Sequence, residues 1–144
     1  MKVIIQDIES KEEESIIINV KEMTEKIMSA INLLKSPDDL IAHLDNQIYR
    51  LPTVKVFYFE SVDLKTFVYM EDTVYQSKLK LYELEELLNE SDFLRVSKQV
   101  IVNLRKIKSI APASGGRFQA LLQNDEKVII SRQYVSILKK KFGL

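Results

Sequence analysis

Hydrophobic residues recur every three or four positions between Val20 and Leu34. This spacing places them on one face of an α-helix. Pro37 disfavours helical geometry at the residue before it, so the helix should end at Ser36. The apolar face of this helix is expected to serve in core or dimer packing.

The residues before this helix show a different pattern. Residues 1–8 and 15–20 are rich in β-branched side chains, and the acidic run 12–14 separates them. Such runs are typical of short strands. Residues 1–37 are therefore expected to form a small ββα extension.

From residue 38 onward the pattern is mainly that of strands joined by turns. The expected strands are 40–44, 48–51, 54–60, 66–70, 73–77, 93–96, 100–104, 107–111, 118–123 and 127–130. Asp45-Asn46 and Glu71-Asp72 have the composition of hairpin turns, and Gly115-Gly116 predicts a further turn. A short amphipathic helix is expected at 78–89.

A last helix is expected to follow Ser131, whose hydroxyl can accept a hydrogen bond from the first helical turn. Tyr134, Leu138 and Phe142 would form its buried side. The pattern predicts a mainly β fold with short helices, in the α+β class, with one domain over residues 38–144.

Composition allows a packed core. The chain has 144 residues, of which 46% are hydrophobic and 29% are charged. It has no cysteine, and no apolar run approaches the ~20 residues of a membrane helix. Met1–Asp7 has no signal-peptide core, so a cytoplasmic location is expected.

Charge divides the chain into two unlike parts. Residues 95–144 contain eleven Lys or Arg and two acids, whereas residues 1–94 contain ten basic and nineteen acidic residues. The formal net charge of zero is thus the sum of about plus nine and minus nine. A basic half favours a polyanionic partner, most commonly nucleic acid.

The sequence gives little support to catalysis. His43 is the single histidine and cannot build a metal cluster or a catalytic triad, so a partly buried structural imidazole is expected. No glycine-rich loop precedes a helix, which argues against a phosphate cradle. We therefore expect no enzyme, no metal, no cofactor and no small-molecule substrate.

The common DNA-reading helices are also missing from the pattern. The basic half is strand-like, so it predicts neither a helix-turn-helix nor a basic helix. DNA would then be read by loops, with Arg or Lys on guanine and Asn or Gln on adenine. The long donors in expected loops are Lys65, Lys98, Gln99, Arg132 and Gln133.

The segment 93–107, FLRVSKQVIVNLRKI, resembles the signature of the LytTR family of DNA-binding domains. Further resemblances flank it in the same order: FYFES at 57–61, LYELEELL at 81–88 and ISRQY at 130–134. The resemblance covers roughly residues 38–144. It implies an elongated antiparallel β domain whose loops enter successive major grooves of promoter DNA, usually as a dimer on repeated sites.

Matched by position, three loops of this chain correspond to the DNA-reading loops of the family. They are the loop before Thr66 with Lys65, the loop of Ser97, Lys98 and Gln99, and the loop of Ser131, Arg132 and Gln133. In the second loop, Lys98 is the expected base contact. Asn103 also fits the signature and is interpreted as a structural residue at the end of a strand.

The chain departs from the family pattern in two respects. Many members have His and Ser where this chain has Ser97 and Gln99, which bears on the target sequence. Many also carry a receiver domain, for which the thirty-seven residues before Asp38 are too few. The chain resembles instead the stand-alone members, whose regulators are often small membrane proteins.

The sequence therefore predicts a sequence-specific transcription regulator that binds double-stranded DNA, as a homodimer. Phosphate contacts are expected from Arg105, Lys106, Lys108 and Lys139. The acidic residues 1–37 should lie away from DNA and form the dimer or bind a regulator.

Two other functions remain open at this stage. The basic face could bind an acidic protein in a module that does not bind DNA. Alternatively, the domain could bind RNA through aromatic residues exposed on a sheet, for which Tyr58, Phe67 and Tyr69 are candidates, although sheet packing explains them better.

Overall fold

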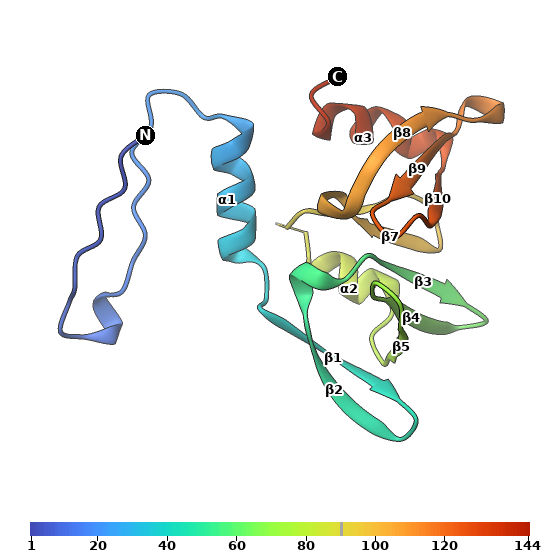
Figure 1. Cartoon of the computed structure of the whole chain (residues 1–144), viewed down its shortest axis with the longest axis horizontal. Helices are drawn as coiled ribbons and strands as arrows, with labels where there is room; N and C mark the ends of the chain where they lie inside the picture. Colours follow the sequence, from blue (N-terminus) through green and yellow to red (C-terminus); the bar gives the residue numbers. More distant parts are fainter. Residues whose placement is uncertain (90) are drawn as a thin grey trace.

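The computed structural model of the protein describes residues 1–89 and 91–144. These residues form two antiparallel sheets and three α-helices, with short 3-10 turns between them (Figure 1). The helices are α1 (Glu25–Lys35), α2 (Leu81–Leu87) and α3 (Val135–Lys141). The strands are β1 (Asp39–Leu44), β2 (Gln47–Pro52), β3 (Tyr58–Val62), β4 (Lys65–Tyr69), β5 (Val74–Ser77), β6 (Phe93–Arg95), β7 (Val100–Asn103), β8 (Ile107–Pro112), β9 (Phe118–Leu122) and β10 (Lys127–Ile130).

Seven strands form the larger sheet, in the order β2-β1-β5-β4-β3-β7-β6. Its hairpins β1–β2 and β4–β5 confirm the turns predicted at Asp45-Asn46 and Glu71-Asp72. Asp45 and Asn46 have φ values of 50° and 64°, a backbone conformation that short polar side chains tolerate. The smaller sheet has the order β10-β9-β8, and its β8–β9 tip at Ser114–Gly116 confirms the predicted glycine turn.

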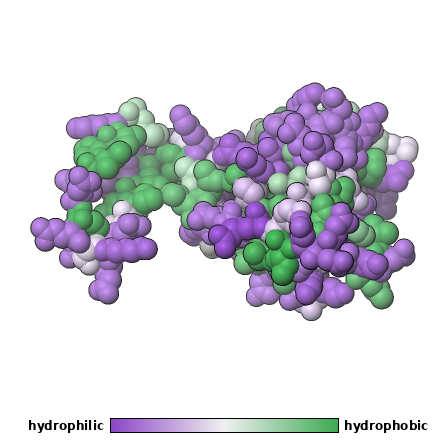
Figure 2. Space-filling view, turned by 60° about the horizontal axis from the view of Figure 1, so that its bottom comes forward, coloured by the Kyte–Doolittle hydropathy of each residue, from purple (hydrophilic) through white to green (hydrophobic). Residues whose placement is uncertain are grey.

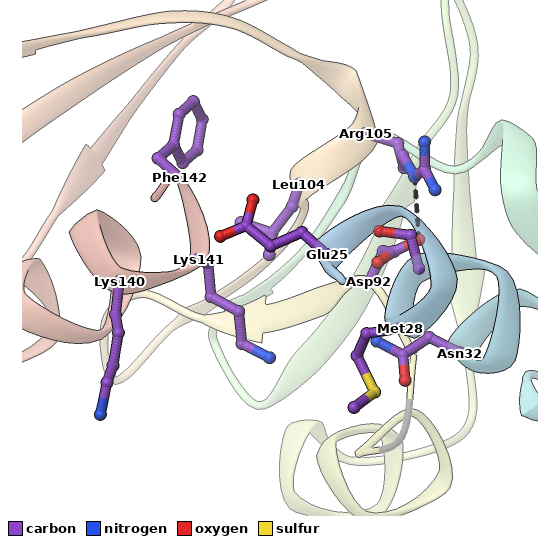
Figure 3. A pocket seen from close by; sticks show the side chains of 10 residues that line it. Glu25, Met28, Asn32, Asp92, Leu104, Arg105, Lys140, Lys141 and Phe142 are labelled. Carbon is purple, nitrogen blue, oxygen red and sulfur yellow. Dashed lines mark hydrogen bonds and ion pairs between the residues drawn. The ribbon is translucent and has the colours of Figure 1, made fainter. Parts of the chain in front are cut away.

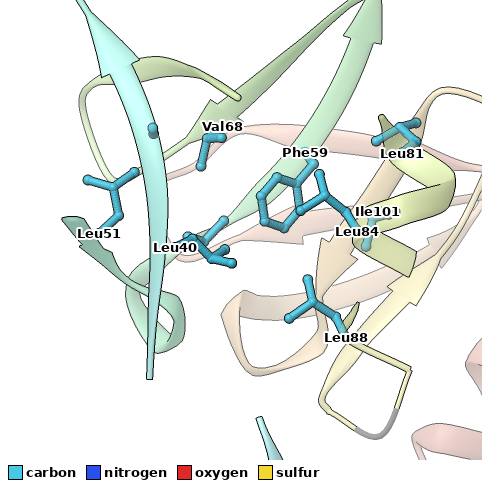
Figure 4. Close-up of a cluster of buried hydrophobic side chains, with 10 residues drawn as sticks. Leu40, Leu51, Phe59, Val68, Leu81, Leu84, Leu88 and Ile101 are labelled. Carbon is cyan, nitrogen blue, oxygen red and sulfur yellow. The ribbon is translucent and has the colours of Figure 1, made fainter. Parts of the chain in front are cut away.

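The first hydrophobic core lies between one face of the larger sheet and α2 (Figure 4). Strand β1 shows why: its alternating residues Leu40 and Ala42 are buried, whereas Asp39 and Ile41 are exposed. The labelled members of this core are Leu40, Leu51, Phe59, Val68, Leu81, Leu84, Leu88 and Ile101.

The second core joins the smaller sheet and α3 to the larger sheet. Val100 and Val102 of β7 belong to it, while Ile101 between them belongs to the first core. All four residues of β7 are buried, because this strand is covered on both faces. Leu138 of α3 is fully buried here, and Tyr134 packs against the same core. The architecture confirms the predicted mainly β fold with short helices.

The two predicted N-terminal strands were wrong. Residues 1–24 run as two extended legs joined by a 3-10 turn at Lys11–Glu13, and neither leg is a strand. Side chains on both legs are exposed, so no packing partner holds the legs in a sheet. The helix α1 itself is confirmed, with Thr24 as its N-cap and its end at Lys35. Of its predicted apolar face, Ile27 is buried and Leu34 is exposed.

Two smaller predictions also differ from the structure. The strand predicted at 54–60 begins only at Tyr58. The carbonyl of Val56 accepts a hydrogen bond from the Asn103 side-chain amide at 2.8 Å and does not pair with a neighbouring strand. Ser131 does not cap the last helix with its side chain, because a 3-10 turn at Arg132–Tyr134 precedes α3. Phe142 remains partly exposed at the end of that helix.

Candidate nucleic-acid interface

Strand pairing brings the three predicted DNA-reading loops to the same end of the molecule. The amide of Ser61, at the end of β3, donates to the carbonyl of Gln99 at 2.8 Å, which joins the first and second loops. The amide of Ser131 donates to the carbonyl of Val96 at 2.8 Å, which joins the second and third. We call this the loop end, defined by residues 63–65, 97–99, 114–117 and 131–133. In Figure 1 the β3–β4 turn and the β8–β9 tip both lie away from α1 and the N-terminus.

The first loop is a tight turn at Asp63 and Leu64, followed by the exposed Lys65. Leu64 has a φ of 65° and is 87% exposed. This conformation costs a residue such as leucine about 1–2 kcal/mol. The Lys80 ammonium donates to the Leu64 carbonyl at 3.1 Å and holds the turn. Strained residues of this kind cluster at binding sites, so Leu64 joins the candidate residues.

The second loop is held by a side chain from the neighbouring strand. The Arg95 guanidinium donates to the carbonyls of Ser97, at 2.8 Å, and Lys98. The Ser97 hydroxyl accepts a hydrogen bond from the Gln99 amide at 3.3 Å. With their backbone fixed, Lys98 and Gln99 expose their side chains, which have no partner among the described residues. The loop thus presents two long donors on a supported backbone.

The third loop lies against the tip of the smaller sheet. A Cβ placed on Gly116 would lie 2.9 Å from Cδ of Arg132, so the glycine makes room for this arginine. Arg132 and Gln133 are both exposed. Arg117 belongs to the same tip, and its guanidinium is oriented by the carbonyl and hydroxyl of Ser114, at 3.0 and 3.1 Å. Arg117 is not among the predicted contacts, and the signal for it in the sequence is an arginine next to two turn glycines.

The predicted phosphate contacts do not lie together. Lys139 has its ammonium 4.9 Å from the ring centroid of Phe118, whose strand pairs with β10 next to the third loop. Arg105, Lys106 and Lys108 follow β7 at the opposite end of the strands. We call that region the turn end, defined by residues 70–73, 104–108 and 123–126.

At the turn end each of these three cations has a partner within the molecule. Arg105 binds Asp92 at 3.0 Å, and Lys108 binds Asp125 at 3.1 Å. The Lys106 ammonium lies 5.0 Å from the centroid of the Phe57 ring. The structure therefore brings Lys139 to the loop end and leaves the other three predicted cations away from it.

Two tyrosines of the larger sheet stack on each other, and Tyr58 also packs against the core that joins the two sheets. Tyr58 and Tyr69 stack with centroids 4.1 Å apart, and the Tyr69 hydroxyl donates to Glu60 at 2.9 Å. Burial and this hydrogen bond raise the pKa of Tyr69 to about 12. Burial, with the carboxylate of Glu126 next to the hydroxyl, also raises the pKa of Tyr58. These rings are packed against each other, which does not favour their use as an RNA-stacking surface.

The described part of the chain shows no group of three or more His, Asp or Glu residues that could hold a metal ion. His43 lies half-buried in β1, as an isolated imidazole. Asn103 has the structural role expected of it. Its side-chain Nδ2 donates to the backbone carbonyl of Val56, and its side-chain Oδ1 accepts from the backbone N–H of Arg105 at 3.0 Å. Within residues 1–89 and 91–144, no helix has the length and apolar character needed to cross a membrane.

Comparison with known proteins gives a consistent result. A family described as "LytTr DNA-binding domain" matches residues 46–143. The chain is similar to a solved LytTr DNA-binding domain of a putative methyl-accepting/DNA response regulator from Bacillus cereus, with a TM-score of 0.71 and 31% sequence identity. This match covers 76% of this chain and all of that one.

Two curated relatives extend the similarity over almost the whole chain. An uncharacterized HTH-type transcriptional regulator of Staphylococcus aureus strain MSSA476 is 28% identical over 141 residues, and its counterpart in strain NCTC 8325 is 27% identical. Each match covers 95% of both proteins. In this chain, however, five strands separate α1 from α2 and five separate α2 from α3. The described helices therefore do not form a helix-turn-helix.

Proposed function

The chain belongs to the LytTR family of DNA-binding domains and is a DNA-binding transcription regulator, and from this premise we propose that it reads promoter DNA with its loop end. The observation that carries the proposal is the gathering of three supported loops whose long polar side chains have no partner in the described molecule. Membership of a DNA-binding family points to a regulator without enzymatic activity.

We assign base contacts to the side chains that reach furthest from the loop end. Lys98 and Arg132 have the donors that suit guanine, and Gln99 and Gln133 can pair with adenine. Lys65 would act at the first loop, next to Leu64, which offers an apolar contact for a thymine methyl group. Ser97 and Ser131 would orient their loops and contact the backbone of the DNA.

Phosphate contacts are proposed mainly for cations at the loop end. Lys139 and Arg117 are exposed there, at the edges of the third loop. The original prediction for Arg105, Lys106 and Lys108 stays a prediction, and the carboxylates bound to Arg105 and Lys108 reduce the charge that these two offer to DNA. Salt dependence can separate the two groups.

The proposal extends to the state and setting of the protein. We propose a homodimer that binds repeated sites, works in the cytoplasm and is controlled by a small membrane protein, as the resemblance to stand-alone LytTR proteins implies. The acidic residues before β1 support this arrangement, because their charge would repel DNA and leaves them for protein contacts.

The test begins with selection of bound sites from random duplex DNA, which supplies a preferred sequence. Lys98→Ala and Arg132→Ala should each weaken binding to that sequence by roughly 10-fold to 100-fold, or on the order of 1–3 kcal/mol. Binding to random duplex should change much less. Arg105→Ala is the matched control, since it removes an exposed arginine of the turn end and should leave sequence preference intact.

Equal losses on selected and random duplex would contradict the base-reading roles. Binding to an acidic protein or to single-stranded RNA in preference to duplex DNA would instead support one of the other two functions. Competition of each against the selected duplex distinguishes these outcomes.

A further inference from the structure

We infer that residues 1–24, which we call the arm, bind the arm of a second copy of this chain in antiparallel orientation. This deepens the proposed function, because it names the surface that would make the homodimer. The arm stands away from the two sheets (Figure 1), and apolar side chains gather on this projecting part of the molecule (Figure 2).

The arm exposes far more apolar surface than an isolated segment can keep in water. Eight Val and Ile side chains of the arm are between 39% and 87% exposed: Val3, Ile4, Ile5, Ile8, Ile16, Ile17, Ile18 and Val20. Residues 3–5 and 16–18 are consecutive, so each leg is apolar on both faces. Segments of this kind are normally covered on both sides by protein.

The helix that follows the arm leaves a second apolar surface open. Ile27 is buried, but Met28, Leu33 and Leu34 are exposed. A cavity of about 330 Å³ separates α1 from the segments around Leu104 and the C-terminal helix (Figure 3). The body therefore covers only part of α1, and the remainder can continue the apolar surface of the arm.

Charge identifies the second copy as the occupant. The turn of the arm carries Glu12, Glu13 and Glu14 against the single cation Lys11, whereas its base carries Lys2 and Lys21 against the single acid Glu22. None of these seven side chains has an ion-pair partner in the described structure. An extended leg of eight residues spans roughly 25 Å. That is more than twice the Debye length of about 10 Å at 0.1 M salt, so turn and base do not neutralise each other within one copy.

An antiparallel pair of arms removes this separation. The acidic turn of each copy then faces the basic base of the other, while the apolar legs cover each other. A parallel pair would place the two acidic turns together. The excess of acid in the arm also disfavours DNA or an anionic lipid surface as the occupant.

The position of the arm is compatible with DNA binding by both copies. It leaves the body at the side opposite to the loop end (Figure 1). A dimer made by the arms therefore keeps both loop ends uncovered. The two properties can be tested apart, since dimerisation uses residues 1–24 and base reading uses the loops.

The first experiment measures the mass of the full chain by sedimentation at about 20 μM. The wild type should have twice the 16.7 kDa mass of one chain. Ile5→Glu combined with Ile17→Glu should give a folded monomer, because the arm lies outside both cores. Ile48→Glu is the matched control: Ile48 is 71% exposed on β2, outside the arm, and the dimer should persist.

A charge exchange then tests the orientation. Reversing the turn (Glu12→Lys, Glu13→Lys and Glu14→Lys) or the base (Lys2→Glu and Lys21→Glu) should each weaken dimerisation at least tenfold. A chain with both reversals should recover the dimer, because each turn again meets a base of opposite charge. A parallel pair would lose little affinity on either single reversal, because like charges face each other in the wild type and in both variants.

The inference is overturned if the wild type is monomeric at this concentration, if Ile5→Glu with Ile17→Glu leaves the dimer intact, or if the double reversal does not recover. In each case a single selected DNA site could still be bound, so base reading by the loop end would stand. A monomeric wild type would remove only the homodimer from the proposed function. A chain that dimerises through the arm but binds no duplex would contradict the proposed function alone.

Discussion

The two ends of the same strands differ in how their cations are used. At the loop end, Lys98 and Arg132 extend from supported loops without a partner in the described molecule. At the turn end, Arg105 and Lys108 bind carboxylates within the chain. Each end carries at least three cations in sequence, but the turn end also carries the four acids Glu71, Asp72, Asp125 and Glu126. The comparison teaches that counting cations alone does not locate a candidate DNA-binding surface, whereas their availability does.

The intramolecular pairs of the turn end are nevertheless weak restraints. Exposed ion pairs of this kind contribute about 0–1 kcal/mol and are screened by salt. Their importance lies in neutralisation: Asp92 and Asp125 lower the positive potential where DNA phosphates would have to approach. The comparison can therefore be tested by perturbing one end and using the other as its control.

After the loss expected from Arg132→Ala itself, the largest effect is expected from the glycine that makes room for Arg132. Gly116→Ala would place a Cβ 2.9 Å from Cδ of Arg132 and displace this side chain. We expect affinity for the selected duplex to fall about fivefold, or roughly 1 kcal/mol. Titration of labelled duplex in a gel-shift or anisotropy assay measures the change.

Gly115→Ala is its matched control. Both glycines have positive φ, of 73° and 76°, so both substitutions should reduce folding stability by about 1–2 kcal/mol. A Cβ added at Gly116 would press on Arg132. A Cβ added at Gly115 would have its nearest neighbour 3.9 Å away, at Nε of Arg117, and would leave Arg132 in place. If both variants lose affinity equally, backbone strain and not the position of Arg132 is responsible.

A smaller effect should appear in the salt dependence of binding. Lys139→Ala should lower the slope of log K against log salt by about 0.9, the value for one lost phosphate contact on duplex DNA. Lys108→Ala should leave the slope unchanged, because Lys108 is paired with Asp125 at the turn end. Affinities measured between about 50 and 200 mM salt give both slopes. A reduced slope for Lys108→Ala would show that the turn end also contacts DNA, as the sequence analysis predicted.

Local chemistry allowed most of the fold to be predicted. Turn residues such as Asp45-Asn46 and Gly115-Gly116 divide the chain into strands, and alternating burial fixes their faces. The N-terminal strands failed because β-branched composition favours a strand only where a neighbouring strand or a core is present. Within one copy of the chain, residues 1–24 have neither a neighbouring strand nor a core to pack against.

The candidate site was predicted only in part, for a similar reason. Motif position located Lys98 and Arg132, because each follows a recognisable strand. It did not separate Lys139 from Arg105, Lys106 and Lys108, since strand direction decides which end of the sheet a residue reaches. Arg117 was not predicted because its place beside the third loop depends on Gly116 and Arg132, which are distant in sequence, meeting in the fold.

The smallest effect on DNA binding is expected from a substitution in the stacked pair Tyr58 and Tyr69. This substitution should change folding stability instead. The pKa of Tyr69 is raised to about 12 in the folded protein, from about 10 in an unfolded chain. Below pH 10 both states keep the proton, so the stabilisation is complete. Between pH 10 and 12 the unfolded chain loses the proton while the folded protein keeps it, and stability falls as pH rises.

Urea unfolding at pH 9 and pH 11 measures this loss, which Tyr69→Phe should reduce because phenylalanine has no proton to release. Tyr82→Phe is the matched control, since Tyr82 is exposed on α2 and should leave the loss unchanged. At pH 8 both variants should bind the selected duplex as the wild type does, because the Tyr69 hydroxyl is bound to Glu60 and not directed to the loop end. Weaker DNA binding by Tyr69→Phe at that pH would mean that the junction between the sheets, and not the loops alone, sets the position of the reading side chains.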